Sequence, residues 1–370
     1  MIYLDNASTT KTSDIVNKTV LEALEKDFYN PSSLHTPGFL ARQKVEKARK
    51  SILSDIGSMD CDLVFTGSAT EANNMALSQV LHGKILVGAG EHPSILEKAK
   101  NLKLLGRDVE FLPLDSNGCV DLDYFKSAMT KDVSFVSVQL VSNETGAIND
   151  VAKITKIAKE TNPRVVVHSD MVQALGKIPV KISAIGVDMA SISAHKICGP
   201  KGIGALVFSK KIKVKPIIFG GGQENGLRSG TENVPQILAF ACAVKTAVQN
   251  QKTTYLNSLH MRNYLIDGFK KSGLKFDVHG NGSPFVLSVS FEKIRGETLM
   301  HALEQDGILI STGSACSSKK AGNTTLSAMG VGIDEIMGNV RISFGSNVVL
   351  DEDLAYVVDC FKKRIKELEK

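Results

Sequence analysis

Residues 187–196 read VDMASISAHK, an apolar run that ends in small residues, a histidine and a lysine. Residues 164–173, RVVVHSDMVQ, have the same character. From about residue 60 to residue 210 such β-branched runs alternate with helical patterns, which is typical of βαβ units and a mostly parallel sheet. We expect seven strands in this α/β sheet: Leu63–Phe65, Lys84–Gly88, Val109–Leu112, Val133–Gln139, Arg164–Ser169, Met189–Ser193 and Ala205–Phe208.

The length of 370 residues favours more than one domain. A long helical pattern runs from about Pro235 to Phe269, and shorter strand and helix patterns follow it. We therefore predict a large α/β domain at residues 16–250 and a small α+β domain at residues 251–370. Residues 1–15 are assigned to the small domain, although the sequence leaves open on which part they pack.

Composition and charge argue against several classes of protein. The net charge of +5 comes without a basic block, so nothing supports direct binding of nucleic acid. No stretch reaches the roughly 20 apolar residues of a membrane span, and the first residues do not resemble a leader, so we expect a cytoplasmic protein. The six cysteines include no Cys-x-x-Cys pair, which predicts neither a metal site nor a disulfide framework.

Three motifs lie where predicted strands end, the place where α/β sheets bind ligands. Lys196 is either a partly desolvated Schiff-base nucleophile or an ordinary solvated lysine. Asp170 either pairs with a protonated pyridine nitrogen or caps the next helix. Residues 66–74, TGSATEANN, offer the N–H groups of a helix N-terminus to a phosphate or form an ordinary Ser/Thr cap. Together, a phosphate seat, a ring-nitrogen partner and a reactive lysine are what a pyridoxal phosphate (PLP) enzyme requires.

The sequence also resembles a known family, the cysteine desulfurases of the NifS/IscS type. These enzymes belong to the class V group within the aspartate-aminotransferase-like fold, fold type I. The resemblance runs from YLDNASTT at residues 3–10 to RISFG at residues 341–345. Its most specific motifs are SAHK at residues 193–196, GGGQENGLRSGT at residues 220–231 and GSAC at residues 313–316. The resemblance implies a PLP-dependent enzyme that acts on L-cysteine.

The resemblance also implies roles for the residues around the PLP ring. Lys196 would bind PLP covalently as a Schiff base, Asp170 would hold the pyridine nitrogen, and Gln173 would hold the ring phenolate oxygen. His92 would stack over the ring and move protons near neutral pH. Without the resemblance, His92 in GEHP could simply cap the following helix, and most lone histidines are structural.

Phosphate and substrate would be bound by a further set of residues. The resemblance assigns the phosphate to the backbone near Ala69, to Thr70, Ser193 and His195, and to Thr231 of the other protomer. The shared site therefore implies a homodimer. Asn143 and Arg341 would bind the substrate carboxylate, a role that suits the planar guanidinium group. Without the resemblance, Arg341 is better explained as a surface arginine on a strand.

Cys316 is the expected catalytic thiol. It lies in STGSACSSKK, residues 311–320, where small residues and two lysines favour an accessible thiolate. By the resemblance, Lys196 removes the Cα proton of L-cysteine and Cys316 attacks the substrate sulfur, leaving L-alanine and a persulfide. Cys198, close to Lys196, is the one alternative thiol that requires a test. The long segment after Cys316 is similar to the branch that hands sulfur to partner proteins, such as an iron–sulfur scaffold or a tRNA-thiolation carrier.

The sequence departs from the family pattern in two places. Residues 319–325 read KKAGNTT where many members have a Glu-Pro-Ser type sequence, so the partner is left open. Ser169 and Met171 stand where Thr and Ala are usual, a change that we expect the pocket to tolerate.

The alternative functions are a selenocysteine lyase, another class V enzyme such as an aminotransferase or a kynureninase-like lyase, and a non-catalytic scaffold. The complete set of reactive residues argues against the scaffold.

Overall fold

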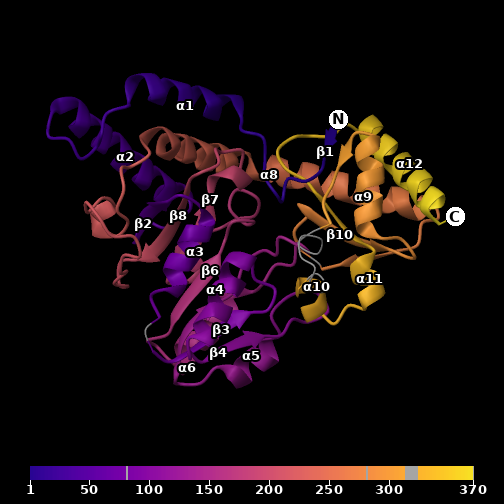
Figure 1. Ribbon diagram of the computed structural model, residues 1–370, viewed down its shortest axis with the longest axis horizontal. Helices are drawn as coiled ribbons and strands as arrows, with labels where there is room; N and C mark the ends of the chain where they lie inside the picture. Colours follow the sequence, from indigo (N-terminus) through magenta and orange to yellow (C-terminus); the bar gives the residue numbers. More distant parts are fainter. Residues whose placement is uncertain (81, 281, 313–323, 370) are drawn as a thin grey trace.

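The computed structural model describes residues 1–369 apart from 81, 281 and 313–323, and its largest unit is a seven-stranded sheet (Figure 1). The strand order is β2-β8-β7-β6-β5-β3-β4. β8 is antiparallel to both of its neighbours, and all other neighbours are parallel, which confirms the predicted mostly parallel sheet. The strands are β2 (Cys61–Thr66), β3 (Lys84–Gly88), β4 (Val109–Leu112), β5 (Val133–Ser137), β6 (Val166–Asp170), β7 (Met189–Ser193) and β8 (Gly204–Ser209).

Side chains from both faces of this sheet are buried. In β8, Ala205 and Val207 pack in one hydrophobic cluster, whereas Leu206 and Phe208 pack in another. Because successive side chains of a strand point to opposite faces, a strand that is covered on both sides is apolar throughout. The helices that follow strands of this sheet are α3 (Ala69–Leu77), α4 (Pro93–Leu104), α5 (Leu122–Ala128), α6 (Val151–Thr161) and α7 (Ile182–Ile185).

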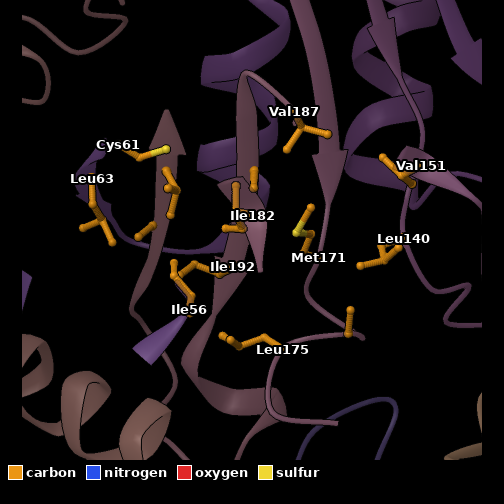
Figure 2. Close-up of a cluster of buried hydrophobic side chains, with 14 of the residues drawn as sticks. Ile56, Cys61, Leu63, Leu140, Val151, Met171, Leu175, Ile182, Val187 and Ile192 are labelled. Carbon is orange, nitrogen blue, oxygen red and sulfur yellow. The ribbon is translucent and has the colours of Figure 1, made fainter. Parts of the chain in front are cut away.

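The larger of the two hydrophobic clusters contains side chains of the sheet, of the first two helices of the chain and of the long helix that follows β8. Figure 2 shows part of it, including Ile192 of β7, Leu63 of β2 and Ile56, which follows α2 (Thr36–Asp55). The helix α1 (Asp14–Lys26) contributes Val16 to the same cluster. The first helices of the chain therefore belong to the core of the large sheet.

A smaller group of elements surrounds an antiparallel sheet of order β12-β10-β9. Its members are β9 (Phe276–His279), β10 (Val286–Phe291), α9 (Gly296–Gln305), β11 (Ile308–Leu309), α10 (Thr324–Ala328), α11 (Ile333–Met337), β12 (Asn339–Ser343) and α12 (Asp351–Leu368). The strand β1 (Ile2–Tyr3) pairs in parallel with β11, and Leu4 is buried in the cluster of this group. Both chain ends lie on this side of the molecule (Figure 1).

The helix α8 (Val234–Lys271) joins the two groups without a break. Its 38 residues span roughly 57 Å at 1.5 Å per residue. Phe240 is buried in the core of the large sheet and Phe269 in the core of the small one. The predicted domain boundary after residue 250 falls inside this helix and stays a prediction. Although α8 is long, neither it nor any other helix in the described part of the chain is apolar enough to cross a bilayer.

Gly268 of α8 lies against α12, and its replacement tests this packing. A Cβ atom at this position would stand 2.5 Å from Cγ2 of Val358. Alanine favours a helix interior by about 1 kcal/mol over glycine, but overpacking costs about 1–3 kcal/mol because a β-branched neighbour has little freedom to move. We expect Gly268→Ala to lower the free energy of unfolding by about 1 kcal/mol, measured by urea denaturation.

The double variant Gly268→Ala/Val358→Ala provides the control. Val358→Ala alone removes buried methyl groups and is destabilising. In the double variant the new methyl group at position 268 enters the space left at position 358, so the combined loss should be smaller than the sum of the single losses. Additive losses would show that the two side chains do not meet.

Candidate active site

A pocket of about 400 Å³ lies at the carboxyl ends of β6 and β7 and beside the N-terminal segment. Its volume lies in the range that holds a cofactor with a small substrate. Of the residues predicted for the site, Ala69, Thr70, His92, Asn143, Asp170, Gln173, His195, Lys196 and Arg341 line it. The structure thus brings together residues from strand ends, helix starts and the smaller sheet.

Asp170 is the last residue of β6, and only 7% of it is exposed. Its Oδ2 atom accepts a hydrogen bond from Nδ2 of Asn73 at 2.8 Å, and its Oδ1 atom accepts one from the N–H of Val172 at 2.9 Å. Nδ2 of Asn73 also donates to Oγ of Ser94 at 2.8 Å. Asn73 therefore joins the middle of α3 to the end of β6 and to the start of α4.

His92 both caps α4 and lines the pocket, so the two interpretations of this residue apply together. Its Nδ1 atom accepts the N–H of Ser94 at 3.1 Å and lies 2.8 Å from Oγ of the same serine. Burial lowers the pKa of His92, an effect that Asp170 opposes and Lys196 reinforces. The neutral ring therefore carries its proton on Nε2, because Nδ1 acts as an acceptor.

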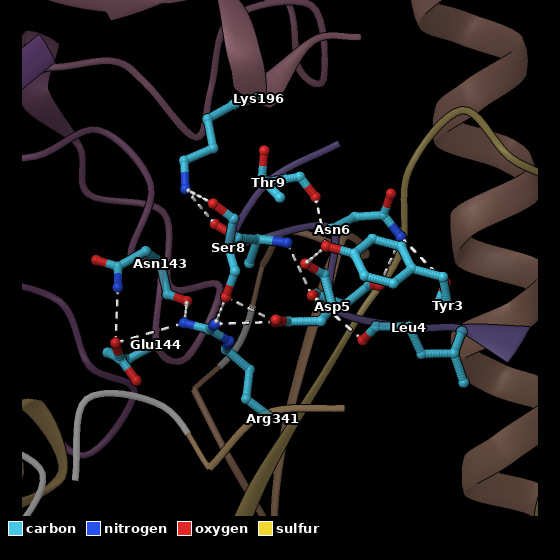
Figure 3. A network of polar contacts seen from close by, with 12 residues as sticks. Tyr3, Leu4, Asp5, Asn6, Ser8, Thr9, Asn143, Glu144, Lys196 and Arg341 are labelled. Carbon is cyan, nitrogen blue, oxygen red and sulfur yellow. Dashed lines mark hydrogen bonds and ion pairs between the residues drawn. The ribbon is translucent and has the colours of Figure 1, made fainter. Parts of the chain in front are cut away.

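Lys196 ends the short 3-10 helix η1 (Ala194–Lys196), which directly follows β7. Its Nζ atom donates hydrogen bonds to the carbonyl oxygens of Ala7 at 2.6 Å and Ser8 at 2.5 Å (Figure 3). Burial lowers the pKa of Lys196 to about 8, and the positive charge of Arg341 acts in the same direction. A lysine with such a pKa has a substantial neutral fraction near physiological pH, as a nucleophile or base requires.

Arg341 lies on β12 and is 5% exposed, so its alternative interpretation as a surface residue is wrong. Its Nη2 atom donates to Oγ of Ser8 at 2.8 Å and to Oδ1 of Asp5 at 3.2 Å. Its Nη1 atom donates to the carbonyl oxygen of Asn143 at 3.0 Å and lies 3.5 Å from Oε1 of Glu144 (Figure 3). The guanidinium group is thus fixed at the edge of the pocket by two separate segments, residues 5–8 and 143–144.

The N-terminus of α3 forms another part of the pocket wall, with Ser68, Ala69 and Thr70. Oγ of Ser68 caps it by accepting the N–H of Glu71 at 3.2 Å. At Gly204 of β8, a Cβ atom would stand 2.8 Å from the backbone nitrogen of Ala69, so the helix start packs directly on this strand. Burial lowers the pKa of the nearby His195 to about 4, so its ring is neutral at physiological pH. Free N–H groups at a helix start with polar neighbours suit an anion.

Two predicted residues of the described chain, Ser193 and Thr231, do not line the pocket, and a third predicted residue is not described. Ser193 is 1% exposed at the end of β7 and is absent from the pocket wall. Thr231 lines a separate cavity together with Gly67 and Arg228. Cys316, the expected catalytic thiol, lies outside the described residues. The role predicted for each of these three residues stays a prediction.

Comparison with known proteins gives a consistent result. The family model for class-V aminotransferases matches residues 2–355. The chain belongs to this family. The cysteine desulfurase IscS of Dictyoglomus turgidum is 38% identical over 99% of this chain and 95% of its own length. The cysteine desulfurase IscS 1 of Archaeoglobus fulgidus is 37% identical over 100% of this chain and 98% of its own.

Solved structures agree with this class-V assignment. A protein described as NifS-like superposes with a TM-score of 0.91 and 33% identity over 99% of both chains. A structure described as SspA in complex with cysteine superposes with a TM-score of 0.79 and 27% identity, over 94% of this chain and 100% of its own. The predicted family, fold class and PLP dependence are confirmed.

The pocket of this class-V chain fits PLP by the chemistry of its donors and acceptors. A buried carboxylate at Asp170 suits a protonated ring nitrogen, and the start of α3 with the exposed hydroxyl of Thr70 suits a phosphate. The lowered pKa of Lys196 suits reaction with an aldehyde. Asn73 and the carbonyls of Ala7 and Ser8 also belong to the site.

These additional residues had weak signals in the sequence. Asn73 lies in the TGSATEANN motif, one helical turn after Ala69 and thus on the same helix face. Ala7 and Ser8 contact Lys196 through backbone carbonyls, which every residue type offers. Among the described cysteines, burial raises the pKa values of Cys61 and Cys119 to about 11, which makes both poor nucleophiles.

The lowered pKa of Lys196 predicts the pH at which its amine becomes reactive. Acetic anhydride acylates neutral amines, so labelling of Lys196 in the apoprotein should rise with pH around a midpoint of about 8, rather than near the ordinary lysine value of roughly 10.4. Mass spectrometry of the peptide that contains Lys196 measures this midpoint.

Arg341→Met should raise the midpoint, because it removes a positive charge that disfavours the ammonium form. Arg341→Lys keeps the charge and serves as the matched control. An ordinary midpoint in the unaltered protein, or the same midpoint in both variants, would contradict the stated causes of the shift.

Proposed function

We propose that this protein is a PLP-dependent cysteine desulfurase, which converts L-cysteine to L-alanine and passes the sulfur to an acceptor protein. The observation that carries the proposal is the meeting of Lys196, Asp170 and Arg341 in one pocket. A base of lowered pKa, a ring-nitrogen partner and a carboxylate-binding arginine are the groups that an amino-acid substrate requires. The names of the two curated relatives and the cysteine complex of SspA support this choice of substrate.

PLP, when bound, supplies an electron sink for the pair of electrons left at Cα when a proton is removed. Asp170 would hold the ring nitrogen and Gln173 the phenolate oxygen. Thr70 and the N–H groups at the start of α3 would hold the phosphate, and the family resemblance adds Ser193 and His195 to this set. His92 would lie over the ring.

The substrate would be oriented by Arg341 and Asn143. To accept a carboxylate, the guanidinium group would exchange its contacts with Asp5 and Ser8 for two parallel hydrogen bonds to the substrate. The amine of Lys196 would then remove the proton from Cα, and Nε2 of His92 offers a further position from which a proton is transferred.

The sulfur would leave the substrate through Cys316. Its thiolate attacks the substrate sulfur, so that an S–S bond forms while the bond between sulfur and Cβ breaks. The electron pair of the broken bond stays on carbon and takes up protons, so one L-cysteine and one thiol yield L-alanine and a persulfide. The persulfide would then pass its outer sulfur to an acceptor.

Cys316→Ser provides the direct test of this reaction. With L-cysteine and a reductant, we expect the unaltered protein to release equal amounts of alanine and sulfide, and the variant to lose at least about 100-fold in rate, because it lacks the thiolate nucleophile. Cys198→Ser is the matched control and should keep its activity. Alanine production at the unaltered rate by the Cys316 variant would exclude the desulfurase mechanism.

We also propose a homodimer in which Thr231 completes the site of the partner. The supporting observation is that Thr231 is exposed and lies outside the pocket of its own chain. Its loop is fixed in place by ion pairs between Arg228 and Glu71 at 2.8 Å and between Glu224 and Arg49 at 2.9 Å. A loop held this firmly can present a side chain to a second protomer.

Mixed dimers test this arrangement. Lys196→Ala and Thr231→Val protomers should each have little activity alone, whereas a mixture that exchanges subunits should regain up to about a quarter of full activity. This recovery follows because the mixed dimer, half of the mixture, has one site with both native residues. If Thr231 served its own chain, mixing would restore nothing.

Three further points complete the proposal; the first follows from the family resemblance and the other two from the sequence. The acceptor would be an iron–sulfur scaffold or a tRNA-thiolation carrier. The protein would act in the cytoplasm. The large and small domains would divide near residue 250, with the first 15 residues in the small domain.

A further inference from the structure

Lys177 is a buried lysine beside the active site that the proposed reaction does not use. It is 5% exposed and comes four residues after Gln173, in the turn that follows β6. Its Nζ atom lies 2.5 Å from Oε1 of Gln173 and 5.7 Å from the centre of the Phe285 ring. Burial lowers the pKa of Lys177 to about 7, and the charge of Lys196 acts in the same direction. Burial of an amine is costly, so a role for this residue is expected.

Lys177 does not itself belong to the wall of the active-site pocket. It lines a second cavity of about 190 Å³, in which Lys196 also takes part. Gln173, by contrast, lines the active-site pocket. The turn between them passes close to α8 at Gly176, where φ is +68° and a Cβ atom would stand 2.6 Å from that of Ala247. The turn thus places Lys177 outside the wall of the active-site pocket, and from there its Nζ atom contacts Oε1 of Gln173.

The contact fixes which end of the Gln173 amide faces the pocket. An ammonium group only donates hydrogen bonds, so the carbonyl oxygen of the amide must be the atom that faces Lys177. The neutral amine also has N–H groups for this oxygen. The other end of the amide, Nε2, donates to the carbonyl oxygen of Ala7 at 3.0 Å, and Ala7 also lines the pocket. The amide thus presents N–H groups on the pocket side.

We propose that Lys177 is a positioning residue, which holds the Gln173 amide with its N–H groups toward the pocket so that a ligand oxygen acting as an acceptor is bound there. The inference rests on the proposed function, since in PLP this acceptor would be the phenolate oxygen. Without Lys177 the amide could rotate and place its own carbonyl oxygen against the phenolate. Two acceptors in contact repel each other, and binding would weaken.

A double-mutant cycle on PLP binding tests this coupling. The variants are Lys177→Met, which keeps length but loses the donors, Gln173→Ala, and the two combined. The dissociation constant of PLP from each apoprotein and the absorption maximum of bound PLP are measured without L-cysteine. We expect Lys177→Met to weaken PLP binding about tenfold when Gln173 is present and less than twofold in the Gln173→Ala background. The absorption maximum should shift only where Gln173 is present.

Equal weakening in both backgrounds would overturn the proposal, because Lys177 would then act independently of the amide. Lys177→Arg, for which the adjoining cavity leaves room, keeps the donors and should restore PLP affinity to within twofold. If Lys177→Met does not fold, Lys177→Leu, which also has no donor, takes its place in the cycle, with thermal unfolding of the apoprotein as the check. Alanine formation by the unaltered protein is assayed separately, so failure of the proposed function and failure of this coupling give different results.

Discussion

The carboxylate of Asp170 is buried at the end of β6, and a buried carboxylate must find its hydrogen-bond donors within the protein. One donor is the neighbouring backbone, and the other is the amide of Asn73, 97 residues earlier in the chain. The same amide nitrogen binds Ser94, whose backbone and side chain hold His92. The buried carboxylate therefore sets the relative positions of the end of β6, the helix α3 and the histidine of the pocket.

The N-terminal segment adds a second constraint, because it contacts both cations of the site. The carbonyl oxygens of Ala7 and Ser8 hold Lys196, while the side chains of Ser8 and Asp5 hold Arg341. The segment itself is tied to the smaller sheet, where the N–H of Ala7 donates to Oγ of Ser343 at 2.8 Å. The distance between the amine of Lys196 and the guanidinium group of Arg341 thus depends on the conformation of residues 5–8.

Much of this arrangement could be predicted from the sequence where the signal is local. The predicted strands Lys84–Gly88, Val109–Leu112 and Met189–Ser193 have the observed bounds. Met189–Ser193 is buried along its whole length, and a strand covered on both faces is recognisable in the sequence as a short run without charged residues. The polar residues that follow such strands could then be placed at one edge of the sheet. The pairing of β1 with β11 could not be predicted, since strands of two residues have no periodicity. The backbone contacts of Lys196 gave no sequence signal for a related reason, as any residue could supply those carbonyls.

The helix α8 limits how the two sheets can change independently. Phe240 and Phe269 lie on one continuous rod yet serve different cores, so a twist or shift that improves packing at one end is transmitted to the other. Recombination between relatives at a point within this helix would therefore have to match two interfaces at once. The two cores that share α8 therefore behave as one unit in such an exchange, and neither can be replaced separately without changing the packing of the other.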